Sequence, residues 1–145
     1  VLGHEGKCRH LHGHRGVAEI TVQAPRLDSI SRVIDFGVIK QLVGGWIDAN
    51  WDHNFLAHPA DLLRKAFYQL AELTLARPEP FLKVVGSAEL TGNKGVYVMR
   101  EGNPTAENMA KELYFIALNL LPPDLKLTKV RIWETPSCYA EFENS

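Results

Sequence analysis

A thiol and several imidazoles lie close together near the start of this 145-residue chain. Four of its six histidines fall within the first fourteen residues, and Cys8 is followed at every second position by His10, His12 and His14. Thiolates and imidazole nitrogens are the ligands that zinc prefers in proteins. A tag remnant or a set of solvated loop histidines is the alternative, although the apolar and Gly residues in between are unlike a tag. The cluster alone leaves both interpretations open.

The segment that follows favours a metal site. Residues Val17 to Ala24 alternate between apolar and polar side chains, which is the period of a half-buried strand. The same period carried backwards puts His12 and His14 on the apolar face, where their ring nitrogens need a partner. Because a His-x-His pair on a strand presents two nitrogens to one ion, the pattern predicts a metal site, most plausibly for zinc.

Helices are expected in the middle of the chain. Asp35 is an N-cap for a helix with apolar residues at helical spacing, namely Phe36, Ile39, Leu42, Val43, Trp46 and Ile47. A loop over Asn50 to His58 carries Asp52 and His53. Ala60 to Leu75 is typical of a second amphipathic helix, with one apolar side formed by Leu63, Ala66, Phe67, Leu70 and Leu73.

The next elements are bounded by Gly and Pro residues. Phe81 to Val85 and Gly95 to Met99 bracket a Gly-rich turn, which suggests a hairpin. Asn103 followed by Pro104 is typical of an N-cap and a first helical position, so a helix is predicted from there to about Leu120.

Two strands end the sequence, Leu127 to Thr135 and Cys138 to Glu143, with a tight turn between them. Val130 and Ile132 face one way together with Glu134. A carboxylate on an apolar face is costly unless something pairs with it, although a Glu at the end of a strand can also lie in water. Strands early and late with helices between them predict an α+β fold.

Composition excludes several classes of protein. With 46% hydrophobic and 23% charged residues the chain is not disordered, and no apolar run approaches the ~20 residues of a membrane-spanning helix. A net charge of -1 argues against a nucleic-acid partner. We expect a single cytoplasmic domain without a signal peptide and with Cys8 and Cys138 as free thiols.

Several short motifs occur together in one order: Cys8 with His12-Gly13-His14, Ile34-Asp35-Phe36, Asp52-His53, Asn103-Pro104-Thr105-Ala106-Glu107-Asn108, and Glu134-Thr135. This set resembles the 6-pyruvoyl-tetrahydropterin synthase family, which includes the 6-carboxytetrahydropterin synthases of the queuosine pathway. The resemblance covers Lys7 to Phe55 and Gly102 to Phe142, whereas Ala57 to Met99 looks like an insertion containing a helix and a possible hairpin.

The resemblance implies the tunnelling fold (T-fold), an antiparallel four-stranded sheet with two main helices on one face. Such domains form trimers that pair into hexamers and close into a barrel, with active sites at the subunit interfaces. The implied substrate is 7,8-dihydroneopterin triphosphate. A single domain of this type is expected over residues 1–145, with its first strand truncated, so that part of that strand would lie before Val1.

The resemblance also implies residue roles. Cys8 matches the catalytic cysteine, and Asp52 and His53 match the pair that completes its proton relay. His12 and His14 match two of three zinc ligands; the third is expected before Val1, with His4 a weaker substitute and His10 a loop residue. Glu134 matches the pterin anchor, and Thr105 and Glu107 match the rest of the pterin pocket. Lys7, Arg9 and Arg15 are nearby candidates for binding the triphosphate.

Two reactions share this site in the family. One releases triphosphate and acetaldehyde and leaves 6-carboxytetrahydropterin; the other eliminates triphosphate and gives 6-pyruvoyltetrahydropterin. The Ile34-Asp35-Phe36 and Asn103 to Glu107 motifs look more like the first branch, a carbon–carbon lyase. Phe55-Leu56-Ala57 stands where the family usually has an Asn or Asp, which leaves a paralogue acting on another pterin open. A non-catalytic zinc-binding assembly module is the alternative from another class, but it has no use for the Asp-His pair or for Glu134.

Overall fold

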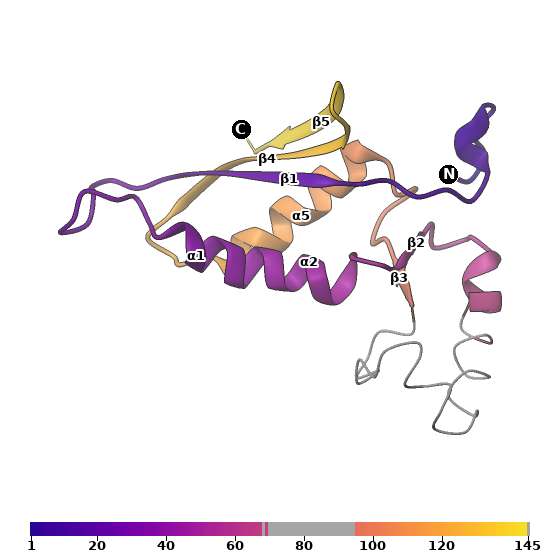
Figure 1. Ribbon diagram of the computed structural model, residues 1–145, viewed down its shortest axis with the longest axis horizontal. Coiled ribbons are helices and arrows are strands. Elements are labelled where there is room, and N and C mark those ends of the chain that lie inside the picture. Colours follow the sequence, from indigo (N-terminus) through magenta and orange to yellow (C-terminus); the bar gives the residue numbers. More distant parts are fainter. Residues whose placement is uncertain (68, 70–94, 145) are drawn as a thin grey trace.

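The computed structural model describes residues 1–67, 69 and 95–144. One antiparallel sheet forms a layer, and the longer helices cover one of its faces (Figure 1). The elements in chain order are η1 (Lys7–Arg9), β1 (Val17–Gln23), α1 (Phe36–Ile39), η2 (Lys40–Gly44), α2 (Gly45–Asn50), β2 (Phe55–Ala57), β3 (Val96–Val98), α5 (Ala106–Leu120), β4 (Lys126–Thr135) and β5 (Cys138–Glu143).

The sheet has the strand order β1-β4-β5 with antiparallel neighbours. Val17 pairs with Trp133, so the start of β1 lies beside the end of β4. The predicted strands are confirmed to within one residue at each end, because their alternation is long enough to define both faces. In the part of the chain that the structure describes, this sheet has three of the four strands that the resemblance implies.

A second, two-stranded sheet corrects one expectation. Phe55–Ala57 is a strand inside the segment predicted to be a loop, and it pairs in parallel with Val96–Val98. The hairpin partner predicted for Gly95 to Met99 at Phe81 to Val85 lies outside the described residues, so the hairpin stays a prediction. Strands of three residues are too short for an alternating pattern to reveal. A hydrogen bond from the amide of Phe55 to the carbonyl of Gly95 (2.9 Å) closes one end of the pair.

The first helical segment runs without a break through α1, η2 and α2. Asp35 caps it as predicted, since its carboxylate accepts a hydrogen bond from the amide of Gly37 at 2.7 Å. Val43 is buried, but Phe36 is 87% exposed, which contradicts its predicted place on the buried face. The reason lies in η2, a π-helical stretch whose wider turn rotates the residues before it away from the face of Val43.

The second predicted helix begins later than expected. Residues 63–67 and 69 are helical, and the helix starts at Leu63 rather than at Ala60. Leu63 is half exposed, so its place on a buried side is wrong, whereas Phe67 stacks on Phe55 with ring centroids 4.5 Å apart. Leu70 and Leu73 lie outside the described residues.

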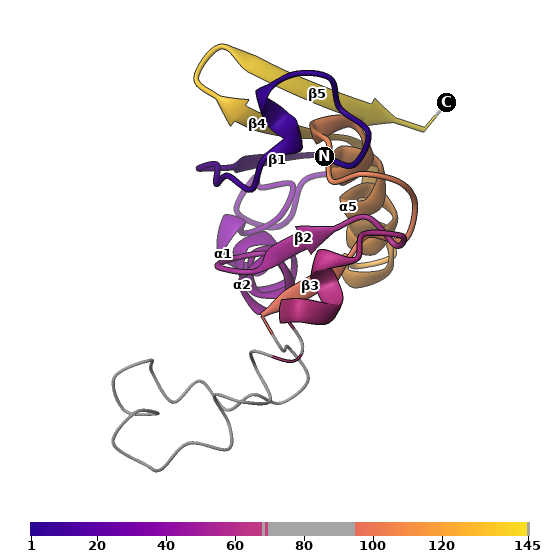
Figure 2. The same ribbon diagram turned by 90° about the vertical axis from the view of Figure 1, so that its right-hand side faces the viewer.

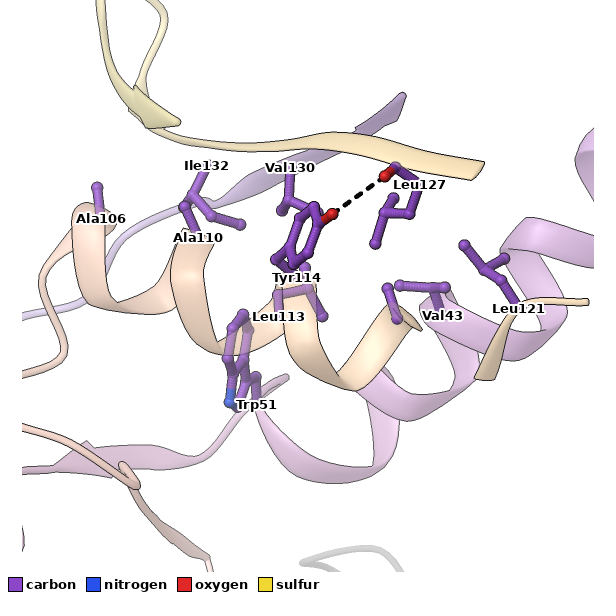
Figure 3. Close-up of a cluster of buried hydrophobic side chains, with 11 residues drawn as sticks. Val43, Trp51, Ala106, Ala110, Leu113, Tyr114, Leu121, Leu127, Val130 and Ile132 are labelled. Atoms are coloured by element: carbon purple, nitrogen blue, oxygen red, sulfur yellow. Dashed lines mark hydrogen bonds between the residues drawn. The ribbon is translucent and has the colours of Figure 1, made fainter. Parts of the chain in front are cut away.

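Helix α5 forms the centre of the core. Its N-cap is Thr105, whose hydroxyl accepts a hydrogen bond from the amide of Asn108 at 3.4 Å, and not Asn103 as predicted. Pro104 consequently precedes the helix. Figure 3 shows side chains of α5 between those of β4 and those of the first helical segment, and the Tyr114 hydroxyl donates a hydrogen bond to the carbonyl of Leu127 at 3.0 Å. Residues buried in this cluster include Val43, Trp51, Ala110, Leu113, Val130 and Ile132.

This topology brings the ends of several strands and helices together at one end of the molecule. The start of β1, the end of β4, the end of α2 and the start of α5 all lie toward the side where the N-terminus is marked (Figures 1 and 2). We call this the site end. Among the described residues, none of the helices is sufficiently long and apolar to cross a membrane.

Candidate active site

The N-terminal segment, residues 1–16, carries the thiol at the site end. Cys8 lies in the short helix η1 and is partly buried, and its carbonyl accepts a hydrogen bond from the Val1 amine at 2.6 Å. Both cysteines are free thiols, as predicted, and Cys138 is exposed at the start of β5, where it pairs with Thr135. The Cys8 sulfur is therefore available for chemistry.

His12 and His14 lie outside the strand. β1 begins only at Val17 and both rings are exposed, so the inward-facing placement predicted from the alternating pattern is wrong. The two rings nevertheless lie together, with centroids 4.8 Å apart and planes at 79°. A glycine separates them and another precedes β1, which lets this segment leave the extended ladder.

The hydrogen bonding of His12 suits a metal ligand. Its Nδ1 lies 2.6 Å from the carbonyl oxygen of His10, an acceptor only, so Nδ1 carries the proton and Nε2 keeps its lone pair. Metal-bound histidines commonly make this contact through their second nitrogen. Within the described ranges no group of three His, Cys, Asp or Glu side chains could hold one ion. The described residues therefore offer two candidate metal ligands, His12 and His14, and no third beside them.

Asp52 and His53 follow directly after α2. The Oδ2 atom of Asp52 lies 2.8 Å from Nδ1 of His53, and the imidazole is 92% exposed. His53 has a φ of 56°, a left-handed conformation that a His adopts more readily than most residues. This turn projects the imidazole away from the helix, and the carboxylate holds Nδ1 as the donor, which leaves Nε2 free to exchange a proton.

Glu134 sits in an irregularity of the sheet. The pairing of β4 with β5 shifts its register between Trp133 and Thr135, which is the signature of a β-bulge. Val130 and Ile132 on the same strand are buried, and Glu134 is partly buried beyond them. A bulge re-aims the side chain that it carries. In the described part of the chain this carboxylate accepts no hydrogen bond, so both oxygens can take a ligand's donors.

Thr105 and Glu107 occupy the start of α5. The Thr105 hydroxyl is engaged in capping the helix, whereas Glu107 is exposed in the first turn, where the helix dipole favours a carboxylate. The candidates for binding triphosphate, Lys7, Arg9 and Arg15, are exposed and form no ion pair with any described carboxylate.

The structure brings some predicted residues together and not others. The N-terminal segment contacts the loop before α5 through Leu2 and Asn103, so the segment that carries Cys8 is joined to the loop that leads to Thr105 and Glu107. Across the described ranges, no hydrogen bond or ion pair joins Cys8 or Glu134 to Asp52 or His53. Among these four residues, the described contacts of one chain join only Asp52 to His53.

Sequence reasoning missed a polar network behind the Asp-His pair. Glu112 of α5 is only 7% exposed; it accepts a hydrogen bond from the Tyr97 hydroxyl at 2.5 Å and one from the Arg100 amide at 3.0 Å. Burial and, next, the bond to Glu112 raise the pKa of Tyr97. The Tyr97 ring meets those of Trp46 and Trp51 edge-on at 5.7 and 6.1 Å, so this network supports the residue before Asp52. In the sequence, this network was indicated only by Glu112, a charged residue among the apolar residues of α5.

Solved structures define the class of this fold. The chain superposes with a TM-score of 0.69 on the protein WS1659 from Wolinella succinogenes, at 26% identity over 95% of this chain and 81% of that one. It superposes with a TM-score of 0.61 on 6-pyruvoyl tetrahydropterin synthase from Plasmodium vivax, at 14% identity over 93% of this chain and 82% of that one. The architecture is thus the α+β T-fold of the tetrahydropterin synthases.

Sequence relatives define the family. The model of the 6-pyruvoyl tetrahydropterin synthase family matches residues 1–145. A 6-carboxy-5,6,7,8-tetrahydropterin synthase from Rickettsia bellii is 37% identical over 97% of this chain and 88% of its own length. One from Aquifex aeolicus is 33% identical over 94% of this chain and 76% of its own length. This chain belongs to the 6-pyruvoyl tetrahydropterin synthase family, and the predicted family, fold class and lyase-type enzyme are confirmed.

Proposed function

We propose that this protein converts 7,8-dihydroneopterin triphosphate and water into 6-carboxy-5,6,7,8-tetrahydropterin, triphosphate and acetaldehyde. The observation that carries the proposal is that relatives as far apart as Rickettsia and Aquifex, similar over nearly the whole chain, are named 6-carboxy-5,6,7,8-tetrahydropterin synthases. The Cys8, His12 and His14 motif lies within the matched length. The product would serve the queuosine branch of pterin metabolism.

His12 and His14 are proposed to hold a zinc ion, together with a third ligand that the described residues do not supply. The contact between Nδ1 of His12 and the His10 carbonyl supports this role, because it leaves Nε2 as the free donor. When bound, zinc would withdraw electron density from the hydroxyl groups of the substrate side chain and so favour removal of a neighbouring proton.

The chain's own residues carry the protons. Cleavage of the substrate side chain requires a proton to leave one carbon and protons to return to the products. Cys8 is the free, partly buried thiol placed to act as one proton carrier. His53 is the other, because Asp52 holds its Nδ1 at 2.8 Å and leaves Nε2 to give and take a proton.

Glu134 is proposed to orient the pterin ring. The 2-amino group and the adjacent ring N–H present two parallel donors, and a carboxylate accepts both at once. Its partly buried position in the bulge, with no competing donor among the described residues, suits this contact. Binding the ring here would direct the side chain of the substrate toward the N-terminal segment.

A neighbouring subunit is proposed to complete the site. Asp52 and His53 contact each other, and the described contacts of one chain do not join this pair to Cys8 or to Glu134. His53 is 92% exposed and Phe36 is 87% exposed, as expected for side chains covered in an assembly. Trimers that pair into hexamers are the proposed form.

Product identity tests the proposal. Zinc-loaded protein is incubated with 7,8-dihydroneopterin triphosphate, with and without a chelator, and acetaldehyde and pterin products are quantified. We expect acetaldehyde and the 6-carboxy product in equal amounts, lost with chelator and with Cys8→Ala but kept with the matched control Cys138→Ala. A pyruvoyl product without acetaldehyde would reassign the reaction to phosphate elimination. No turnover, with pterin binding unaffected by changing Glu134, would favour the assembly module.

A further inference from the structure

Asn103 ties the N-terminal segment to the loop before α5. Its Oδ1 accepts a hydrogen bond from the amide of Leu2 at 2.8 Å, and its Nδ2 donates one to the carbonyl of Leu2 at 2.9 Å. The side-chain amide thus pairs with a backbone unit in the way that a neighbouring strand would. Because both hydrogen bonds go to one residue, they fix the orientation of the Leu2 backbone relative to Asn103 as well as its distance.

Asn103 is itself fixed by the start of α5. Its carbonyl accepts hydrogen bonds from Nδ2 of Asn108 at 2.9 Å and from the amide of Thr105 at 2.8 Å. Gly102 has a φ of 65°, and a Cβ atom there would lie 2.8 Å from Nδ2 of Asn108, so a glycine is needed for this approach. The two hydrogen bonds between Asn103 and Leu2 are therefore held by the same turn that leads to Thr105 and Glu107, the proposed pterin-pocket residues.

The N-terminal segment has little else to hold it. Helix η1 has no buried residue, and residues 9–15 are exposed. In the part of the chain that the structure describes, the Leu2–Asn103 pair provides the only hydrogen bonds that join residues 1–14 to a distant position. Backbone hydrogen bonds from the His4 amide to the Val1 carbonyl at 3.3 Å and from the Arg9 amide to the Gly6 carbonyl at 3.2 Å form two turns, which link Leu2 to the turn that carries Cys8.

We propose that Asn103 is a positioning residue that places Cys8 against the pterin end of the site, with Asn108 and Gly102 holding Asn103 in place. The inference rests on the proposed function only in giving Cys8 a role in turnover. Displacing a reacting group by ~1 Å costs on the order of 100-fold in rate. Asn103→Ala should accordingly lower kcat about 10- to 100-fold and leave KM within about threefold, because Glu134 still holds the ring.

Cys8 itself reports on this placement without any turnover. We compare wild type with Asn103→Ala and with Asn103→Asp, which keeps the acceptor for the Leu2 amide and loses the donor. Asn119→Ala is the matched control: it also removes a side-chain amide, but one whose Nδ2 donates to the Phe115 carbonyl at 2.7 Å within α5 and does not contact the N-terminal segment. The measurements are the alkylation rate of Cys8, with Cys138 as internal standard, and amide exchange of residues 1–10.

The expected order is clear. Asn103→Ala should raise both the Cys8 alkylation rate and the exchange of residues 1–10 at least fivefold, Asn103→Asp by less, and Asn119→Ala not at all. If Asn103→Ala folds poorly, Asn103→Asp gives the same comparison. Wild-type alkylation and exchange in both Asn103 variants would overturn the inference even if activity fell. Faster alkylation in a protein whose wild type makes no acetaldehyde would support the placement and reject the proposed reaction instead.

Discussion

Replacing Tyr97 by Phe tests the buried network behind the Asp-His pair. The change removes only the hydroxyl and keeps the ring contacts with Trp46 and Trp51. Glu112, which is 7% exposed, then loses its 2.5 Å donor and keeps the Arg100 amide at 3.0 Å. The Arg100 Nε atom is 4.0 Å from the carboxylate and its side chain is 64% exposed, so it replaces the lost hydrogen bond only in part.

The magnitude follows from the charge of the acceptor. A hydrogen bond to a charged group contributes roughly 1.5–3 kcal/mol, so Tyr97→Phe should lower the free energy of unfolding by about 2 kcal/mol at pH 7. Glu112→Gln should cost less, about 1 kcal/mol, because an amide can accept from the Arg100 amide and donate to the Tyr97 oxygen. The double variant should cost less than the sum, since both changes remove one shared interaction.

Urea unfolding at several pH values supplies the measurement. Burial first and the bond to Glu112 second raise the pKa of Tyr97 in the folded state. An unfolded Tyr ionises near pH ~10, so the stabilisation is complete below that pH and is lost as the pH rises above it. Between pH 7 and pH 11 wild type should lose up to about 1.4 kcal/mol more than Tyr97→Phe, most of it above pH 10. Equal stability of the two proteins at pH 7, or a difference that stays constant to pH 11, would refute this reasoning.

Three further predictions concern the site itself. Asp52→Asn should lower kcat by roughly 10²- to 10⁴-fold in the acetaldehyde assay without changing metal content, because the imidazole loses the charge that fixes its tautomer, and unchanged kcat would contradict the relay. His12→Ala should reduce bound zinc in a metal analysis, whereas His10→Ala keeps the backbone carbonyl that orients His12 and should bind zinc like wild type. Glu134→Gln should weaken pterin binding about 10- to 100-fold in calorimetry while the Tm stays within a few degrees, since no described hydrogen bond is lost; unaltered affinity would remove Glu134 from the pocket.

The strands of the main sheet could be predicted because their alternation of apolar and polar residues is long enough. β1, β4 and β5 show alternation over six residues or more, and their observed bounds agree with the sequence to within a residue. The end of α5 was equally clear from its two following prolines. β2 and β3 are three residues each, and their pairing depends on hydrogen bonds between distant segments, which no local pattern contains.

The errors have local physical causes. Phe36 fits the helical spacing, but the π-helical stretch of η2 rotates it into solvent. Asn103 and Pro104 form a good helix start in isolation, yet the Asn103 side chain bonds to Leu2, and Thr105 takes the cap. In both cases a tertiary contact or an irregular turn overrides a correct local preference.

The candidate site lies where the regular pattern ends, and this explains why composition and period located it only in part. His12 and His14 precede the first ladder pair, His53 adopts a left-handed turn, and Glu134 occupies a bulge. At each irregularity, a polar side chain points in a direction that the regular strand or helix beside it would not allow. The spacing of apolar residues therefore predicts the regular strands and helices. Extended into the irregular residues it places them wrongly, as it did for His12 and His14. Residue type and spacing, by contrast, are unaffected by the local backbone. The motifs therefore identified the family, while the alternating pattern gave the wrong placement for His12 and His14, the proposed metal ligands.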